Sequence, residues 1–108
     1  MGADPFVQFA FGKDAKAAFA AAVEQAEYSY GHAGYTGTIA EKGEFVLIDK
    51  CLNADVARAL AEEMSDDDRV SDKWGPAGCI EVEEAVCPNL RPPQKGDRLF
   101  CFFGWASS

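Results

Sequence analysis

The sequence predicts a single α+β domain, residues 1–108, in which two helices cover one face of a mainly antiparallel sheet of four to five strands. Two segments, 13–30 and 54–64, repeat apolar residues at the spacing of a helix. Short apolar or alternating segments, typical of strands, separate and flank them. A chain of 108 residues is long enough to form one domain with its own core.

The first half of the chain predicts strand, helix and strand. The first strand is expected at 6–11, where the residues are mostly apolar, and Gly12 ends it. The helix expected at 13–30 carries alanine and aromatic residues along one side. Gly31 is suited to end that helix, because glycine takes the left-handed conformation at little cost. A strand is expected at 36–40, which is rich in β-branched residues.

The next segment predicts a buried strand followed by the second helix. Residues 45–48 are continuously apolar, which favours a central strand covered on both faces. Asn53 precedes the second helical pattern and is a preferred N-cap residue. We therefore expect the helix to begin directly after Asn53 and to bury its apolar side on the sheet.

The last third of the chain predicts two further strands. Residues 79–83 alternate between apolar and acidic, 99–103 are apolar, and 104–108 are expected to form a tail. The complete order is βαββαβ with one extra strand. This order is that of a ferredoxin-like split βαβ sandwich, with the C-terminal strand paired to the fourth strand.

The charge of the chain restricts its partners. Acidic residues outnumber basic ones 18 to 10, for a formal net charge of −8. Proteins that bind duplex nucleic acid or anionic membranes use Lys and Arg, so we expect neither kind of partner. A basic protein partner is favoured, although solubility alone also explains an acidic surface. No apolar run approaches the roughly 20 residues of a membrane span, and no signal peptide is visible, so we expect a cytoplasmic protein.

The four cysteines indicate buried thiols instead of a metal centre. Zinc sites usually contain cysteines about two to four residues apart, and no such pair occurs. We expect neither a metal nor a cofactor, and disulfides remain an open alternative. The cysteines lie far apart in the chain, at Cys51, Cys79, Cys87 and Cys101.

Two glycine-rich links carry residues that the fold does not explain. His32 and Tyr35 lie between glycines in the first link, and Lys73 and Trp74 precede a Gly-Pro pair in the second. Neither link matches a phosphate-binding or dinucleotide-binding glycine pattern. Tyr and Trp are frequent at binding hot spots, and His is the side chain that titrates near neutrality. We expect the two links to lie near the same end of the sheet, although a helix cap and a turn also explain the first.

An acidic block follows the second helix. Three of its aspartates are consecutive, so their side chains diverge and do not match the spacing of a calcium-binding loop. A solvated helix end explains this block, and so does a docking patch for a basic partner. The block comprises Glu62, Glu63, Asp66, Asp67, Asp68 and Asp72.

These features lead to the hypothesis of a small, acidic, non-enzymatic binding protein that docks on a basic protein. In size and charge the chain is similar to accessory proteins of phages and mobile elements, including anti-CRISPR inhibitors. That resemblance implies an inhibitor that blocks a nucleic-acid-binding surface by charge mimicry. The expected contact residues are His32, Tyr35, Asp66, Asp67, Asp68, Asp72, Lys73 and Trp74.

Two other classes of function remain open. The first is a small ligand-binding domain or enzyme that uses the loop of His32 and Tyr35. The second is a structural homo-oligomer, such as a homodimer, joined through a sheet edge or through the aromatic C-terminal strand. A pocket that contains His32 would favour the first class, and association that depends on concentration would favour the second.

Overall fold

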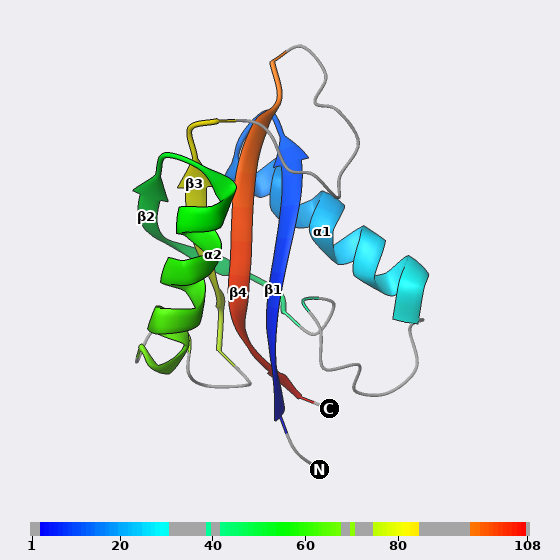
Figure 1. The fold of residues 1–108 in the computed structure, drawn as a ribbon. Coiled ribbons are helices and arrows are strands. Elements are labelled where there is room, and N and C mark those ends of the chain that lie inside the picture. Colours follow the sequence, from blue (N-terminus) through cyan, green and yellow to red (C-terminus); the bar gives the residue numbers. More distant parts are fainter. Residues whose placement is uncertain are drawn as a thin grey trace.

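The computed structural model describes residues 3–30, 39, 42–67, 70, 75–84 and 96–107. Within these ranges the chain forms one sheet of four strands, two α-helices and a short 3-10 helix (Figure 1). In chain order the elements are β1 (Ala3–Gly12), α1 (Ala15–Tyr30), β2 (Phe45–Cys51), α2 (Ala54–Glu63), η2 (Met64–Asp66), β3 (Ala77–Val82) and β4 (Arg98–Ser107). The α+β class predicted from the sequence is confirmed.

The sheet is mixed, with the strand order β1-β4-β3-β2. β4 runs antiparallel to both of its neighbours, β1 and β3, whereas β2 pairs parallel to β3 at the edge. In a ferredoxin-like sheet the first and third strands are central. The sequence assigned these places to residues 6–11 and 45–48, which belong to β1 and β2, but here both are edge strands. The ferredoxin-like order is therefore not confirmed. The expected pairing of the C-terminal strand with residues 79–83 is found, because β4 pairs with β3.

The two helices cover opposite faces of the sheet, so the prediction that both cover one face is wrong. Figure 1 shows α2 in front of the sheet and α1 behind it. Along β4, Phe100 and Phe102 pack with the alanines of α1, whereas Leu99, Cys101 and Phe103 pack with α2. Successive residues of a strand point to opposite faces. An apolar strand such as β4 therefore needs a cover on each face.

Small residues allow α1 to lie close to the sheet. The Asp14 side chain caps the helix by accepting a hydrogen bond from the Ala17 N–H at 2.8 Å. Ala18 and Ala22 are fully buried. The side-chain amide of Gln8, on β1, donates a hydrogen bond to the Ala22 carbonyl at 3.0 Å. The alanine face and this hydrogen bond fix α1 against β1.

The second helix begins where the sequence predicts. The Asn53 side chain accepts a hydrogen bond from the Val56 N–H at 3.0 Å, as expected for an N-cap. Ala57 and Ala61 are buried against the sheet, and the chain continues beyond Glu63 as η2. Helix α2 connects the parallel strands β2 and β3, as in a βαβ unit.

The structure corrects two details of the strand prediction and leaves a third largely outside the described residues. β2 is an edge strand, and Leu47 is 60% exposed, so residues 45–48 do not form a central strand. Residues 104–107 continue β4 because each pairs with β1, so they are not a tail. The strand predicted at 36–40 lies outside the described residues except for Ile39, which is buried in a 3-10 turn.

We expect Gly12→Ala to lower the free energy of unfolding by about 1–3 kcal/mol, the usual cost of overpacking. A Cβ atom at Gly12 would lie 2.4 Å from the backbone nitrogen of Ala18, so α1 or β1 has to move. Gly43→Ala is the matched control, because a Cβ there meets nothing within 4 Å. Chemical denaturation of both variants tests this close packing, and equal midpoints would contradict it.

Candidate functional site

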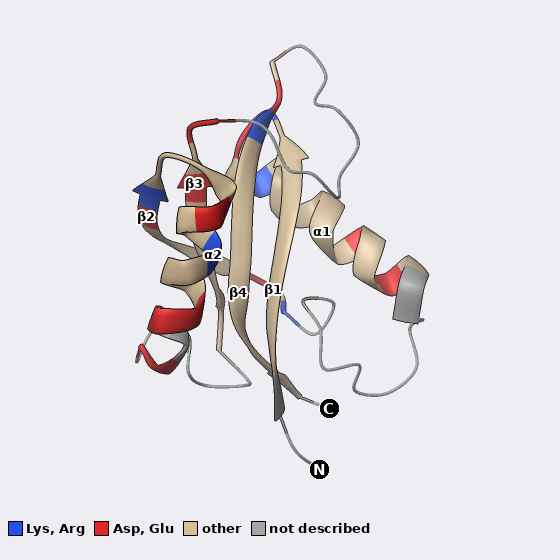
Figure 2. Cartoon of the chain, viewed as in Figure 1, with Lys and Arg blue, Asp and Glu red and all other residues tan. Residues whose placement is uncertain are grey.

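The outward side of α2 is acidic toward its C-terminal end (Figure 2). Glu62, Glu63 and Asp66 are exposed there, and the last turn of α2 carries no basic residue. The C-terminal end of a helix dipole is already negative, so these carboxylates add to an unfavourable local potential. Arg58, the one basic residue within α2, lies over the ring of Phe9 at 5.3 Å. The C-terminal end of α2 therefore exposes mainly acidic groups.

The opposite end of α2 exposes apolar side chains. Leu52 and Val56 are 57% and 49% exposed, which is high for large apolar residues. Both lie at the first turn of α2 or just before it, beside the exposed Asp55. The outward side of this helix thus combines an apolar end with an acidic end. We call the surface formed by Leu52, Val56, Glu62, Glu63 and Asp66 the α2 surface.

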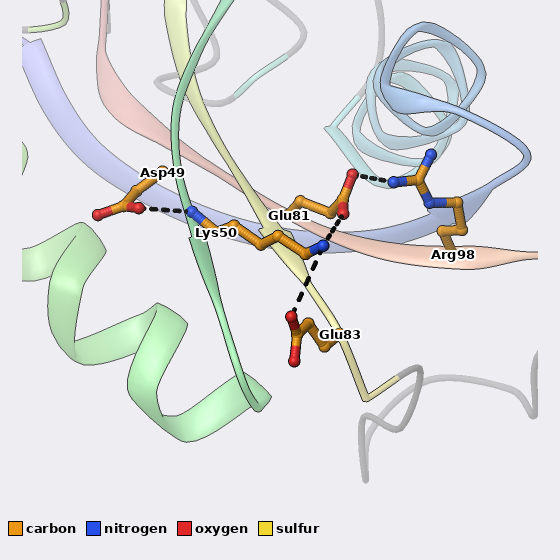
Figure 3. A network of polar contacts seen from close by, with 5 residues as sticks. All are labelled: Asp49, Lys50, Glu81, Glu83 and Arg98. Atoms are coloured by element: carbon orange, nitrogen blue, oxygen red, sulfur yellow. Dashed lines mark hydrogen bonds and ion pairs between the residues drawn. The ribbon is translucent and has the colours of Figure 1, made fainter.

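A second polar group lies on the other face of the sheet and centres on Glu81 (Figure 3). The Arg98 guanidinium, on β4, donates a hydrogen bond to Glu81, on β3. Lys50, on β2, places its Nζ 3.4 Å from Oε2 of Glu81 and 3.6 Å from Oε1 of Glu83. One carboxylate thereby links three neighbouring strands. The Arg98 guanidinium also lies over the ring of Phe100.

A β-bulge in β2 brings Lys50 to this network. The register of β2 against β3 shifts between Leu47, which pairs with Cys79, and Asp49, which pairs with Ile80. The extra residue changes the alternation of side chains, so that Lys50 lies opposite Glu81. Figure 3 shows the Asp49 side chain extending away from Glu81. Without the bulge, the ammonium group would not share a face with Glu81.

The environment of Glu81 lowers the pKa of its carboxyl group. Burial by itself raises this pKa, but hydrogen bonds and charges from Arg98 and Lys50 together outweigh burial. The side chain is 17% exposed, whereas those of Lys50 and Arg98 are about half exposed. Solvent therefore screens the cations, and the network contributes modestly to stability.

Two grooves adjoin this network. The first groove has a volume of about 330 Å³ and is lined by Val82, Asp97 and the network residues Lys50, Glu81, Glu83 and Arg98. The second has a volume of about 310 Å³ and is lined by residues 47–50 and Glu81. Ligand pockets usually measure about 300–1,000 Å³ and are mostly apolar. These grooves lie at the lower limit, and most of the residues that line them are charged. Neither is lined by a histidine, cysteine or serine that could act as a nucleophile or a general base.

The described cysteines are buried thiols that are poorly suited to chemistry. Cys51, Cys79 and Cys101 form no disulfide. Burial, with a smaller effect of the Glu81 charge, raises the pKa of Cys79 to about 12, and burial also raises the pKa of Cys51. Across the described residues, no three His, Cys, Asp or Glu side chains lie close enough to hold a metal ion.

Two of the residues predicted to contact a partner are described by the structure. Asp66 is exposed at the end of η2, and Asp67 is half-buried, with its carbonyl accepting a hydrogen bond from the Val70 N–H at 2.9 Å. The expected common surface of the two glycine-rich links stays a prediction. The link residues His32, Tyr35, Lys73 and Trp74 lie outside the described ranges. Asp68 and Asp72 of the acidic block lie outside them as well.

The sequence pattern did not identify the network around Glu81. Its members are far apart in the chain, and the register and the bulge bring them together. The alternation of acids at positions 81 and 83 was the one visible signal. The described part also contains a buried lysine, Lys42, whose Nζ donates a hydrogen bond to the Gly75 carbonyl at 2.8 Å. This bond ties the start of β2 to the approach to β3.

No family model, no curated protein and no solved structure matches this chain. Neither α1 nor α2 is long and apolar enough to cross a membrane.

We expect Glu81→Gln to lower stability at neutral pH by about 1 kcal/mol, since it removes the charge that Arg98 and Lys50 share. The folded-state pKa lies below its ordinary value of 4.5. The stabilisation is therefore complete above pH 4.5 and is lost as the pH falls through the folded-state pKa. Denaturation of wild type and variant at pH 7 and at about pH 3 measures this difference. Glu83→Gln, which loses one longer contact, is the control, and an equal effect of the two variants would contradict a central role of Glu81.

We expect Cys79 and Cys101 to react with a thiol reagent only after unfolding, because both are fully buried. Cys51, which is 9% exposed, should react slowly in the native protein. Peptide mapping by mass spectrometry after timed alkylation, with and without guanidinium chloride, assigns each rate to its cysteine. Rapid labelling of Cys79 in the native state would show that the face beneath α1 is open.

Proposed function

We propose that this chain is a small acidic binding module that docks on a basic protein through the α2 surface. The observation that supports this function is the acidic end of α2, where Glu62, Glu63 and Asp66 are exposed and the last turn contains no basic residue. This arrangement is unfavourable for the isolated helix. Contact with a cationic partner surface would relieve it.

The apolar end of the α2 surface gives such a contact a second component. Charges mainly set the rate of association and the choice of partner, whereas buried apolar side chains supply much of the affinity. Val56 and Glu63 lie seven residues apart on one side of the helix, about 10 Å along its axis at 1.5 Å per residue. The matching partner segment presents an apolar side chain and, at about that distance, Lys or Arg.

A finer form of the proposal is inhibition of a nucleic-acid-binding protein. Carboxylates at the end of a helix resemble backbone phosphates in charge, and a groove that binds nucleic acid is rich in Lys and Arg. The net charge of −8 is consistent with such mimicry. In this form the α2 surface occupies the groove and excludes the nucleic acid. The resemblance in size and charge to phage-encoded inhibitors is the reason for this choice of partner.

We expect Glu62→Gln combined with Glu63→Gln to reduce capture of basic proteins from a lysate. Both positions are exposed, so the change removes charge from the α2 surface without affecting the core. Glu44→Gln combined with Glu84→Gln is the matched control, because it removes two exposed acidic charges elsewhere. The measurement is quantitative mass spectrometry of proteins retained by each immobilised variant, at low and at moderate salt.

A loss limited to the first variant, with retention of the same proteins by the control, supports the proposal. Equal losses with the two variants would show that only net charge matters. Retention unchanged by salt and by both variants would contradict electrostatic docking, because contacts between exposed charges weaken as salt screens them. A second variant, Val56→Ser, tests the apolar end and should accelerate dissociation.

A further inference from the structure

The parallel strands of the described sheet, β2 and β3, end beside a groove. Cys51 and Val82 form the last pair between these strands, and the groove of about 330 Å³ is lined by Val82 and by residues next to both strand ends. Figure 1 shows the arrowheads of β2 and β3 at this end of the sheet. In open sheets with parallel strands, ligands usually bind in the crevice at the carboxyl ends. The groove therefore lies where the topology favours a ligand.

Arg98 lines this groove with most of its hydrogen-bond donors unused. A guanidinium group has five N–H donors in one plane. Within the described part of the chain, Arg98 donates to Glu81 and lies over the ring of Phe100, 5.6 Å from its centroid. Its side chain is 50% exposed, which leaves donors accessible from the groove. The contacts with Glu81 and Phe100 hold the guanidinium in an orientation in which it can bind a second carboxylate.

Glu83 provides the opposite charge close to Arg98. Its side chain is 52% exposed, and its described contact is to the ammonium group of Lys50, at 3.6 Å. Glu83 follows Val82, and Arg98 precedes Leu99, which pairs with Val82. The two charged side chains thus start from neighbouring positions on adjacent segments, and adjacent strands lie about 4.8 Å apart. Figure 3 shows both side chains in one group.

The charges of the groove favour a ligand that carries both signs. Three carboxylates and two cations line the groove, which gives a formal net charge of −1. A phosphate or another dianion would be repelled by the carboxylates. A simple amine would leave the donors of Arg98 without an anion. A volume at the lower limit of ligand pockets suits a small molecule. The charged residues are Lys50, Glu81, Glu83, Asp97 and Arg98.

We propose that this groove binds a free α-amino acid as a zwitterion, whose carboxylate accepts hydrogen bonds from Arg98 and whose ammonium group donates to Glu83. The two charged groups of an α-amino acid are attached to one carbon atom, which suits two protein groups that start from neighbouring positions. Contacts between exposed charges contribute modestly, so the dissociation constant should be on the order of 1 mM. The site lies on the opposite face of the sheet from the α2 surface and does not depend on docking there.

The test is an NMR titration of the isotope-labelled full chain with glycine, L-serine, L-leucine and L-phenylalanine. At least one of them should cause saturable shifts of the amide signals of the residues that line the groove. Its N-acetyl derivative, which lacks the ammonium group, and its amide, which lacks the carboxylate, should each bind about threefold to fivefold more weakly. The absence of saturable shifts with all four amino acids overturns the proposal. Equal binding of an amino acid and both derivatives overturns recognition of a zwitterion.

Matched variants test the two contacts separately. In Arg98→Gln the amino acid and its amide should bind alike, because the partner of the carboxylate is gone. Arg58→Gln is the control, since it removes a cation that also lies over an aromatic ring, but on α2. Glu83→Gln should abolish the difference between the amino acid and its N-acetyl derivative, whereas Glu84→Gln, at the exposed neighbouring position, should preserve it.

The amide spectra of the free variants establish that they are folded. Glu83 is half exposed and makes one longer contact, so Glu83→Gln tests the site even where Arg98→Gln disturbs the sheet. A loss of discrimination limited to Arg98→Gln and Glu83→Gln supports the proposal. Equal behaviour of each variant and its control overturns the assignment of Arg98 and Glu83 as the binding groups.

Discussion

The apolar character of β4 on both of its faces is the constraint on which the rest of the structure depends. Phe100 and Phe102 point to one face of the sheet, and Leu99, Cys101 and Phe103 to the other, and all five are almost completely buried. Burial of a large apolar side chain contributes about 1.5–3 kcal/mol, so neither face can be left in water. The chain meets this constraint by placing β4 between two other strands and one helix over each face.

The exposed surfaces follow from how these covers are built. α1 approaches its face through alanines, which leaves a helix rich in alanine on its outward side as well. α2 buries its own alanines and turns outward the acids of its C-terminal end and the apolar side chains of its N-terminal end. The Glu81 network lies near the ends of β2, β3 and β4, where charged side chains replace the apolar ones. It ties the edge strand to the centre of the sheet and does not resemble a reactive site.

We base the proposed docking role on the charge and exposure of these surfaces. The described grooves are lined mainly by charged residues, and the described thiols are buried, with a raised pKa at Cys51 and Cys79. The two helices present two different outward surfaces. That of α2 is acidic with exposed apolar side chains at the other end, and that of α1 carries alanines between exposed polar and charged side chains.

Local patterns in the sequence determined the α+β class, both helices, the Asn53 cap, the acidic end of α2 and the central residues of β3 and β4. Each depends on interactions within a few residues or on simple periodicity. The tertiary structure alone decided the strand order, the opposite placement of the helices, the edge position of β2 and the Glu81 network. An apolar run such as residues 45–48 has the same sequence pattern in a central strand and in a partly covered edge strand. Its burial depends on the neighbours that pack against it. Lys50 and Glu81 meet through a register shift between strands, and such long-range pairing leaves no local mark in the sequence.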